Sequence, residues 1–357
     1  MTTIDIERSR RLLRLGGTSL VDVIVGLALA MIAMVVVYGA FVAIDTVRRS
    51  AASTADAQSA SRFALFSIAS QLANAGAGWS VAARWLDSCP FDANVATTLR
   101  PIAVLITDGG GDDRPDTLVV RRALAPAIRL PAAFASAAVA GSDFRVQSPD
   151  GFVAGDRVVS ISRTGACAMS QVTGVGAPAG GVVDIAHTPT AMDFPITSVL
   201  LDLGPAGLAS TLRFDVVSQT LRSQDLANGD APVPIASDIV NVKFQYGIES
   251  DGDGALDTWV RASAPGPWSP AALLAAPRTT LDRILAVRIG MVVRGDRVDS
   301  TLMRDYHWVL FDCEAADKTT CPGRLEGTIA AGSSGSYRYR TVETVVPLIN
   351  VLWNRGA

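Results

Sequence analysis

The sequence predicts an α+β protein in which one long, partly transmembrane N-terminal helix packs on a globular domain rich in antiparallel β-sheet. Two observations support this prediction. No charged residue occurs from Val23 to Ile44, and no proline occurs before Pro90. After Trp79 the chain changes to short β-like segments separated by glycine, proline, aspartate and serine. A helix is therefore expected first, followed by strands that are joined by turns.

The composition is that of a globular protein that carries one apolar segment. Hydrophobic residues make up 49% of the 357 residues and charged residues 18%, a balance that argues against intrinsic disorder. The net charge is −3, and no basic patch occurs outside residues 1–15. We therefore expect a folded domain tethered to a membrane and no nucleic-acid partner.

Residues 1–17 are expected to form a short basic leader. Its arginines precede the apolar run, whereas Asp45 weakens the positive charge on the far side. Because basic flanks stay in the cytoplasm, we expect the N-terminus there and the bulk of the chain in the periplasm. A cleaved secretory signal peptide is the alternative, although its apolar core would span only about 7–15 residues.

A single long helix is expected over residues 18–78, with its transmembrane half at about 20–44. About twenty apolar residues in a helix cross a bilayer core of roughly 30 Å. In the second half, apolar residues recur every three or four positions and predict a face that packs on the domain. This face comprises Phe63, Leu65, Phe66, Ile68, Ala69 and Leu72. Gly76 and Gly78 are expected to end the helix.

Residues 79–357 are expected to form one β-rich periplasmic domain. Runs of β-branched and aromatic residues mark its candidate strands. These are Thr117–Arg121, Arg157–Ser162, Gly181–Ile185, Ser198–Leu203, Thr211–Val217, Ile239–Tyr246, Ile284–Val293 and Val342–Leu348. Apolar and polar side chains alternate over Val242–Tyr246, so one face of this strand is expected to be buried and the other wet.

An acidic residue, Asp22, stands at the start of the apolar span. Placing a carboxylate within a bilayer costs roughly 2.5–3.5 kcal/mol on insertion scales, so an acid at this position is a functional hypothesis by default. The alternative is a carboxylate that merely reaches the headgroup layer.

Together with the basic leader, the sequence Gly16-Gly17-Thr18-Ser19-Leu20-Val21-Asp22 resembles the N-terminus of type IV prepilins. Other segments resemble the large minor pilins of the PilW type. They are Ser61–Gly76, Asp116–Arg121, Gly155–Val159, Ile239–Asp257, Leu285–Arg294 and Val342–Asn350. The resemblance implies a type IV pilin-like protein and extends over most of the chain.

The resemblance also implies how the N-terminus is processed. A prepilin peptidase would cut after Gly17 and N-methylate Thr18, which stands where most pilins have phenylalanine. Asp22 stands where the family has a glutamate. Pairing the Asp22 carboxylate of one subunit with the Thr18 amine of another would fix the axial register between helices during assembly, the best-attested use of a buried ion pair.

The implied function is that of a minor pilin in type IV pilus assembly, in the complex that primes the pilus and forms its tip. Its partners would be other minor pilins and the major pilin through the N-terminal helix, the prepilin peptidase and a tip adhesin. The precursor would cross the inner membrane once, before the mature subunit enters the extracellular pilus. Two alternatives stay open: a minor pseudopilin of a type II secretion system, and a membrane-tethered periplasmic binding protein or enzyme.

One loop has the residue spacing of a calcium site, and calcium is the one candidate cofactor. Oxygen atoms at alternate positions could converge on a hard cation; the candidate ligands are Glu249, Asp251, Asp253, the carbonyl of Ala255, and Asp257. The bidentate acid of an EF-hand is missing, because Val260 stands at position 12. A solvated turn is the alternative, and a turn is expected for the second acidic stretch, Asp108–Asp116.

The four cysteines are Cys89, Cys167, Cys313 and Cys321, with no C-x-x-C pair, which argues against a structural zinc site. Their even number suits disulfides in an oxidising compartment, with free thiols as the alternative. Cys313 and Cys321 are close enough to close a small loop, which would leave Cys89 to pair with Cys167. The other connectivities stay open.

The sequence offers little for catalysis. It contains no H-E-x-x-H, G-x-S-x-G or G-x-x-x-x-G-K-[ST] motif. His187 and His307 are expected to be ordinary surface or packing residues. We therefore expect a protein that is not an enzyme.

Overall fold

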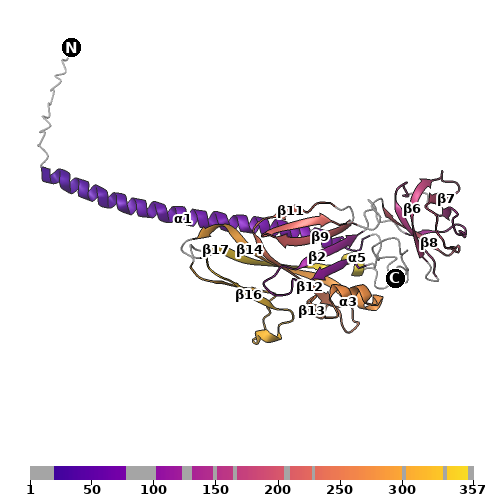
Figure 1. The fold of residues 1–357 in the computed structure, drawn as a ribbon. Helices are drawn as coiled ribbons and strands as arrows, with labels where there is room; N and C mark the ends of the chain where they lie inside the picture. The colour runs from indigo at the N-terminus through magenta and orange to yellow at the C-terminus, as the bar shows by residue number, and fades with distance from the viewer. Residues whose placement is uncertain are drawn as a thin grey trace, which may run out of the picture. The chain divides into compact units, whose positions relative to one another are not determined.

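The computed structural model describes residues 20–77, 102–122, 131–147, 151–163, 167–204, 210–226, 230–299, 303–332 and 336–352. The chain divides into two compact units, Met1–Ala52 and Ser53–Ala357. One helix, α1 (Leu20–Ala73), belongs to both units, and antiparallel strands follow it (Figure 1). The expected fold class, a long N-terminal helix followed by a domain rich in antiparallel sheet, is confirmed.

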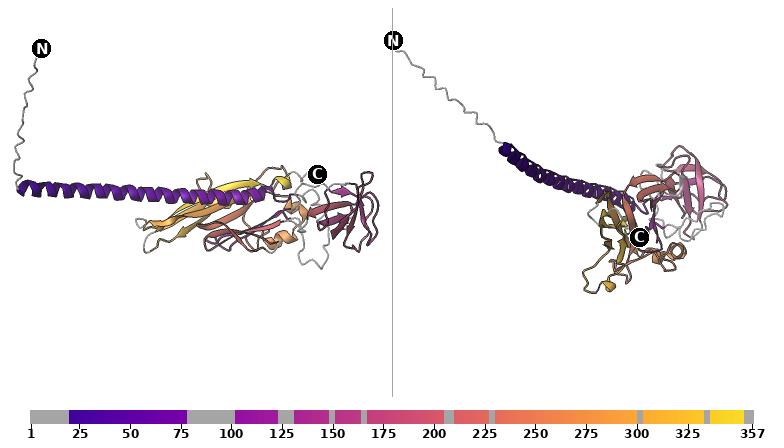
Figure 2. Two further views of the ribbon diagram at one scale, coloured as in Figure 1. Left: turned by 90° about the horizontal axis from the view of Figure 1, so that it is seen from above. Right: turned by 60° about the vertical axis from the view of Figure 1, so that its left-hand side comes forward.

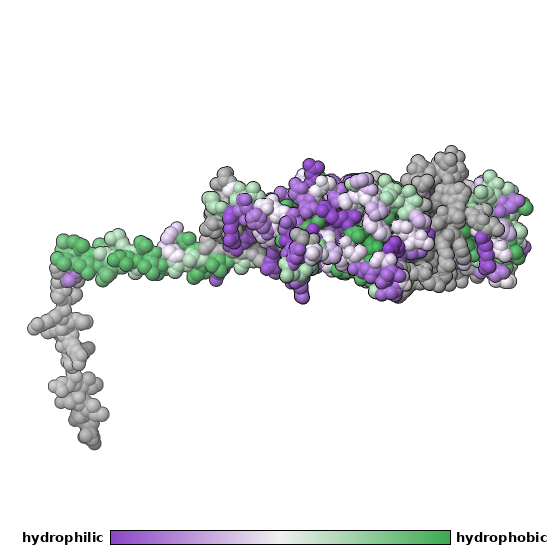
Figure 3. All heavy atoms as spheres, turned by 90° about the horizontal axis from the view of Figure 1, so that it is seen from below, coloured by the Kyte–Doolittle hydropathy of each residue, from purple (hydrophilic) through white to green (hydrophobic). Residues whose placement is uncertain are grey.

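The first unit contains the apolar part of α1. The segment Leu20–Asp45 is long and apolar enough to cross a membrane, and none of it is buried. Figure 3 shows it as a nearly continuous hydrophobic surface. A helix satisfies its backbone hydrogen bonds internally, as a segment in lipid must. This part of the chain therefore fits a membrane anchor.

In the second unit, α1 buries one narrow stripe against the β domain. The stripe consists of Ala57, Ala64, Ile68 and Leu72, with Leu65 and Ala69 partly buried beside it. The expectation that Phe63 and Phe66 belong to this face is wrong, because they are 58% and 70% exposed. Successive residues of an α-helix are rotated by about 100° around the helix axis. Phe63 and Phe66 therefore point away from the buried stripe, although they are close to its residues in the sequence.

Two sheets pack with this half of α1 (Figures 1 and 2). The five-stranded sheet has the order β1 (Val104–Thr107), β2 (Thr117–Arg122), β9 (Ser210–Val217), β10 (Thr220–Asp225) and β11 (Val233–Ala236). The four-stranded sheet has the order β13 (Thr258–Val260), β12 (Ile239–Ile248), β14 (Ile284–Asp299) and β17 (Ser336–Pro347).

The main hydrophobic core lies between α1 and these two sheets. From the helix it contains Ile68 and Leu72, and from β9 and β12 it contains Phe214 and Phe244. Tyr246 is completely buried in it, and its hydroxyl oxygen accepts a hydrogen bond from the Ile106 amide at 2.6 Å. A buried tyrosine usually needs such a partner, and this one ties β12 to β1.

The opposite face of the four-stranded sheet is polar and nevertheless buried. Lys243 and Gln245 on β12 are only 1% and 0% exposed, and Arg288 on β14 is 9% exposed. The expectation that this face of β12 contacts water is therefore wrong. The loops described below cover it and satisfy its polar groups, which is the condition for burying them.

Smaller elements complete this part of the chain. They are the hairpin β15 (Tyr306–Leu310) and β16 (Leu325–Ile329), the helices α3 (Pro270–Ala275), α4 (Arg278–Leu281) and α5 (Ile349–Leu352), and the short 3₁₀ helix η2 (Lys318–Thr320). The hairpin contributes Trp308, Leu310 and Leu325 to a small cluster with Val292 of β14.

A separate six-stranded sheet has its own core. Its order is β3 (Ala132–Ala133), β8 (Val199–Gly204), β5 (Arg157–Ile161), β6 (Cys167–Val175), β7 (Val183–His187) and β4 (Phe144–Val146). All six strands lie between β2 and β9 in the sequence, and Figure 1 shows β6, β7 and β8 grouped together.

Each of the eight expected strands overlaps an observed one. The observed β14 and β17 extend well beyond the predicted segments, and short or strongly polar strands such as β1, β10 and β16 were not expected. The composition of β10 (Thr220–Asp225) explains why this strand was not expected. Five of its six side chains are polar or charged, and only Leu221 is buried.

Candidate functional site

The processing site expected at the N-terminus is only partly visible. Gly17 and Thr18 lie outside the described residues, whereas Asp22 lies in the first turn of α1. A carboxylate in the first turn is stabilised by the partial positive charge of the helix N-terminus. Asp22 therefore lies where it also helps the helix to begin.

Two exposed surfaces of α1 could contact other helices. In the first unit, the apolar segment Leu20–Asp45 has no buried residues. In the second unit, Phe63 and Phe66 project from the side of α1 opposite the buried stripe. Neighbours on that side are small or polar, such as Ser59. Helices pack by fitting the ridges of side chains on one into the grooves of the other, and these two side chains form such a ridge.

The candidate calcium loop joins β12 to β13. The structure brings together carboxylate oxygens of Glu249, Asp251 and Asp257, which all lie within 4.8 Å of one another. Asp253 does not join them; its carboxylate accepts a hydrogen bond from the Ala255 amide at 2.6 Å. Three of the five expected ligands thus converge.

Hydrogen bonds within the loop already engage these carboxylates. Asp257 accepts bonds from both the amide and the hydroxyl of Ser250, each at 2.5 Å, and Glu249 accepts one from the Gly252 amide. The pKa of Asp257 is lowered from its ordinary value, chiefly by the hydrogen bond from the Ser250 hydroxyl. The loop is therefore a hydrogen-bonded turn that also presents a cluster of negative charge.

Calcium provides a direct test of this loop. At about 10 mM calcium, a site of millimolar to submillimolar affinity would raise the free energy of unfolding by about 1–3 kcal/mol. We expect calcium to raise the melting temperature of the purified protein accordingly, because the ion would neutralise three converging carboxylates. Asp251→Asn should abolish the rise, and Asp253→Asn is the matched control that should keep it. If calcium does not change the melting temperature, or if the two variants have equal effects, the loop is not a calcium site and serves only as a turn.

The disulfide expected between Cys313 and Cys321 is present, with the two Cα atoms 5.7 Å apart. Cys167 is also disulfide-bonded. Cys89, its expected partner, lies outside the described residues. Disulfides in this chain agree with an oxidising compartment.

Arg288 holds the loop of the Cys313–Cys321 disulfide on the polar face of the sheet. Its guanidinium donates to the carbonyl of Pro322 at 2.7 Å and to Oε1 of Gln245 at 2.5 and 2.9 Å. It also lies over the ring of Phe311 at 4.3 Å and that of Trp259 at 4.8 Å, within the range of a cation–π interaction. Burial lowers the pKa of Arg288 to about 10, and Glu343 opposes this shift.

A second buried cation organises the acidic turn at 108–116. The ammonium group of Lys243 donates its three protons to the carbonyls of Gly111 and Arg114, at 2.8 and 2.9 Å, and to the Asp116 carboxylate at 2.6 Å. The same carboxylate accepts the amides of Gly109 and Phe244, each at 3.0 Å. The turn was expected, but its attachment to Lys243 was not, because the residues are far apart in sequence.

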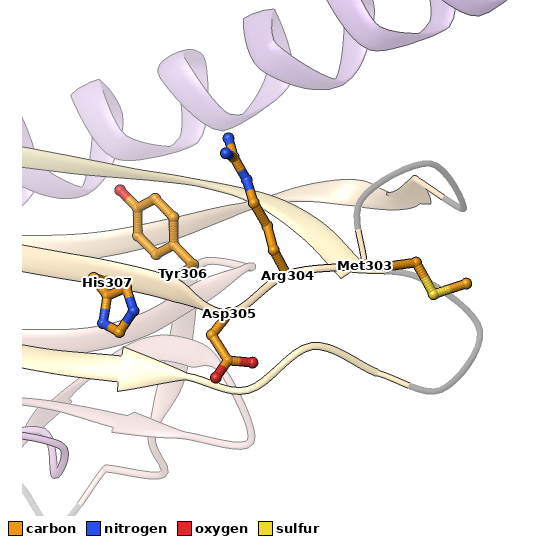
Figure 4. Close-up of a pocket in the computed structure, with 5 residues that line it drawn as sticks. All are labelled: Met303, Arg304, Asp305, Tyr306 and His307. Atoms are coloured by element: carbon orange, nitrogen blue, oxygen red, sulfur yellow. The ribbon is translucent and has the colours of Figure 1, made fainter.

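An open cavity is lined by consecutive residues at the start of β15. Its volume is about 690 Å³, and its lining comprises Met303, Arg304, Asp305, Tyr306 and His307. In Figure 4 the side chains of Arg304 and Tyr306 extend to one side of the strand and those of Asp305 and His307 to the other. Asp305 accepts the Ala331 amide, and Nδ1 of His307 lies 2.8 Å from the Thr328 hydroxyl. Both polar groups thus serve to join β15 to the segment around β16.

The second histidine, His187, lies in the six-stranded sheet. Its ring stacks on Phe144 at 3.6 Å between centroids, and its two nitrogens lie 2.7 and 3.1 Å from the carbonyl oxygens of Thr188 and Ser142. These contacts connect two loops, and they are the packing role that was expected of this residue.

The fold is that of a long N-terminal helix, apolar and exposed in its first half, whose second half packs on an antiparallel β domain, as expected for a type IV pilin-like protein. One comparison shows a similarity over part of the chain. Residues 210–350 match the family model of the type IV pilus-assembly protein W, PilW. The chain is thus PilW-like, and the match supports a part in type IV pilus assembly. No match was found among curated proteins or among solved structures.

Proposed function

We propose that this protein is a minor pilin that enters the type IV pilus through α1 and belongs to the complex that primes assembly and forms the tip. The observation that carries the proposal is the helix: Leu20–Asp45 has no buried residue, while the second half of α1 is built into a β domain. An apolar surface of this kind must be covered, by lipid or by other helices.

The apolar surface of α1 can be covered both before and after the subunit enters the pilus. Before assembly, lipid covers the apolar half of α1 and the β domain lies in the periplasm. After extraction from the inner membrane, neighbouring helices of other minor pilins and of the major pilin replace the lipid. Lipid tails are as apolar as leucine, so this exchange depends on packing and polar contacts between helices.

Asp22 would supply such a polar contact. Its carboxylate would pair with the amine of Thr18 on an adjacent subunit, after a prepilin peptidase has cut behind Gly17 and methylated the new terminus. A buried ion pair contributes little net stability, because desolvation opposes the attraction, but it specifies register. The subunit would then support a tip adhesin at the end of the pilus.

Mass spectrometry of the mature N-terminus tests this proposal. We expect a peptide that begins at N-methylated Thr18 in cells with the peptidase, and the uncut precursor in cells without it. Gly17→Leu is the matched variant that should block cutting without changing the helix. A mature chain that begins at Met1 or Thr2, or near Gly39, would contradict the proposal.

A further inference from the structure

The six-stranded sheet between β2 and β9 closes on itself. Its two end strands are β3 and β4, and Phe134, the residue that follows β3, forms an antiparallel bridge with Val146 of β4. Two backbone hydrogen bonds flank this bridge: the Ala135 amide donates to the Arg145 carbonyl at 2.7 Å, and the Gln147 amide donates to the Ala133 carbonyl at 2.8 Å. The six strands therefore form a closed β-barrel, which has no free edge.

Side chains fill the barrel. Its interior contains three phenylalanines in mutual contact, Phe134, Phe144 and Phe194, each only 1% exposed. Aliphatic residues from β4 and β7, such as Val146 and Ile185, complete this core and are fully buried. Small barrels are commonly filled in this way. The barrel thus has a hydrophobic core of its own.

The two ends of the insertion meet at one place in the five-stranded sheet. Strands β2 and β9 are antiparallel neighbours, and Arg122, the last residue of β2, is paired directly with Ser210, the first residue of β9. The chain therefore leaves this sheet and returns to it across a single residue pair. The match to the PilW family model begins at the same point, residue 210.

From the closed barrel and its point of insertion, we infer that the barrel between Arg122 and Ser210 is a self-contained folding module inserted into the pilin-like core, and that subunit assembly does not require it. Among the described residues, the strands of the barrel pair only with one another and share no sheet hydrogen bond with β9–β14. Closely spaced ends are the geometry at which domain insertions are tolerated.

Native-state hydrogen exchange on the full chain in detergent tests whether the module folds separately. Phe144→Ala should speed exchange in β5–β8 by about a hundredfold or more, because it removes the centre of the barrel core, and should leave β9, β12 and β14 unchanged. Phe214→Ala is the matched control: this phenylalanine is also 1% exposed but belongs to the main core, so the pattern should reverse. Equal acceleration of both regions by either variant would overturn the inference.

Excision tests the second part of the inference, which rests on the proposed function. In the variant, Arg122 is joined to Ser210 through Asn-Gly, a pair that forms a tight turn between antiparallel strands, and Cys89→Ser removes the thiol expected to bond Cys167. We expect β9, β12 and β14 to keep their protection, and pili to form at the wild-type level. Loss of that protection would overturn the inference, as would a folded variant that fails to assemble. If the full chain also fails to enter pili, the proposed function is wrong. The hydrogen-exchange result on the full chain would still decide whether the barrel folds separately.

Discussion

Replacing Lys243 by methionine is expected to lower the free energy of unfolding by about 3–5 kcal/mol, the cost of leaving one partner of a buried ion pair alone. Methionine keeps most of the volume but removes the ammonium donor from the Asp116 carboxylate and from the Gly111 and Arg114 carbonyls. Two amides, of Gly109 and Phe244, would remain on the carboxylate. Unfolding by urea, followed by circular dichroism, measures the loss.

The pH dependence of this loss has a definite sign. Burial raises the pKa of Asp116 above its ordinary value of 3.8, and Lys243 acts against that rise. A carboxyl group whose pKa is raised by folding binds more protons in the folded state, so stability falls as pH increases from about 4 through the folded pKa. Without Lys243 the pKa rises further, and the variant should lose more stability at neutral pH than in acid.

Lys318→Met provides the control for Lys243→Met. Lys318 pairs with Asp312 at 3.2 Å, but the two side chains are 44% and 48% exposed. A surface pair of this kind contributes about 0–1 kcal/mol, so the control should unfold nearly as the wild type does. If the two methionine variants lose similar stability, burial of the ammonium group is not what matters and the stated role of Lys243 is wrong.

Replacing Asp22 by alanine is expected to abolish incorporation into pili while leaving the amount of protein in the membrane unchanged. The apolar span survives the substitution, and removing an acid makes insertion easier. What the variant lacks is the carboxylate that, on the proposed function, pairs with the amine of an adjacent subunit. Immunoblots of sheared pili and of membranes measure the two quantities separately.

Two further variants separate charge from shape at this position. Asp22→Glu keeps the carboxylate and should assemble, whereas Asp22→Asn keeps the shape without the charge and should fail. Wild-type incorporation of Asp22→Ala would support a protein whose helix is only an anchor. That result would contradict the register role of Asp22 but would leave the description of the fold intact.

Local patterns predicted most of the fold. The helix could be expected from the absence of proline and charge, and the eight strands from β-branched runs, because both patterns depend on residues close together in sequence. The short disulfide loop could be expected for the same reason. Lys243 could not be interpreted correctly: alternation over Val242–Tyr246 places it opposite Phe244 but says nothing about what covers that face.

The candidate sites divide in the same way. The spacing of Glu249, Asp251 and Asp257 suggested convergence, and the structure brings these three together. It also turns Asp253 toward the backbone of its own loop, at Ala255, which no spacing rule predicts. Arg288 gave no signal in the sequence, because its aromatic and carbonyl partners come from three separate segments of the chain.

By itself, the sequence determined the apolar span with its acid at Asp22, the antiparallel β class and the small disulfide loop, since each depends on periodicity or short spacing. Only the tertiary structure decided which side of α1 is buried, that a lysine serves as an internal cation, and that the six strands close into a barrel. These features depend on contacts between residues more than a hundred positions apart, or on a bridge between the two ends of a sheet. Burial and closure are properties of such contacts and not of any local stretch of chain.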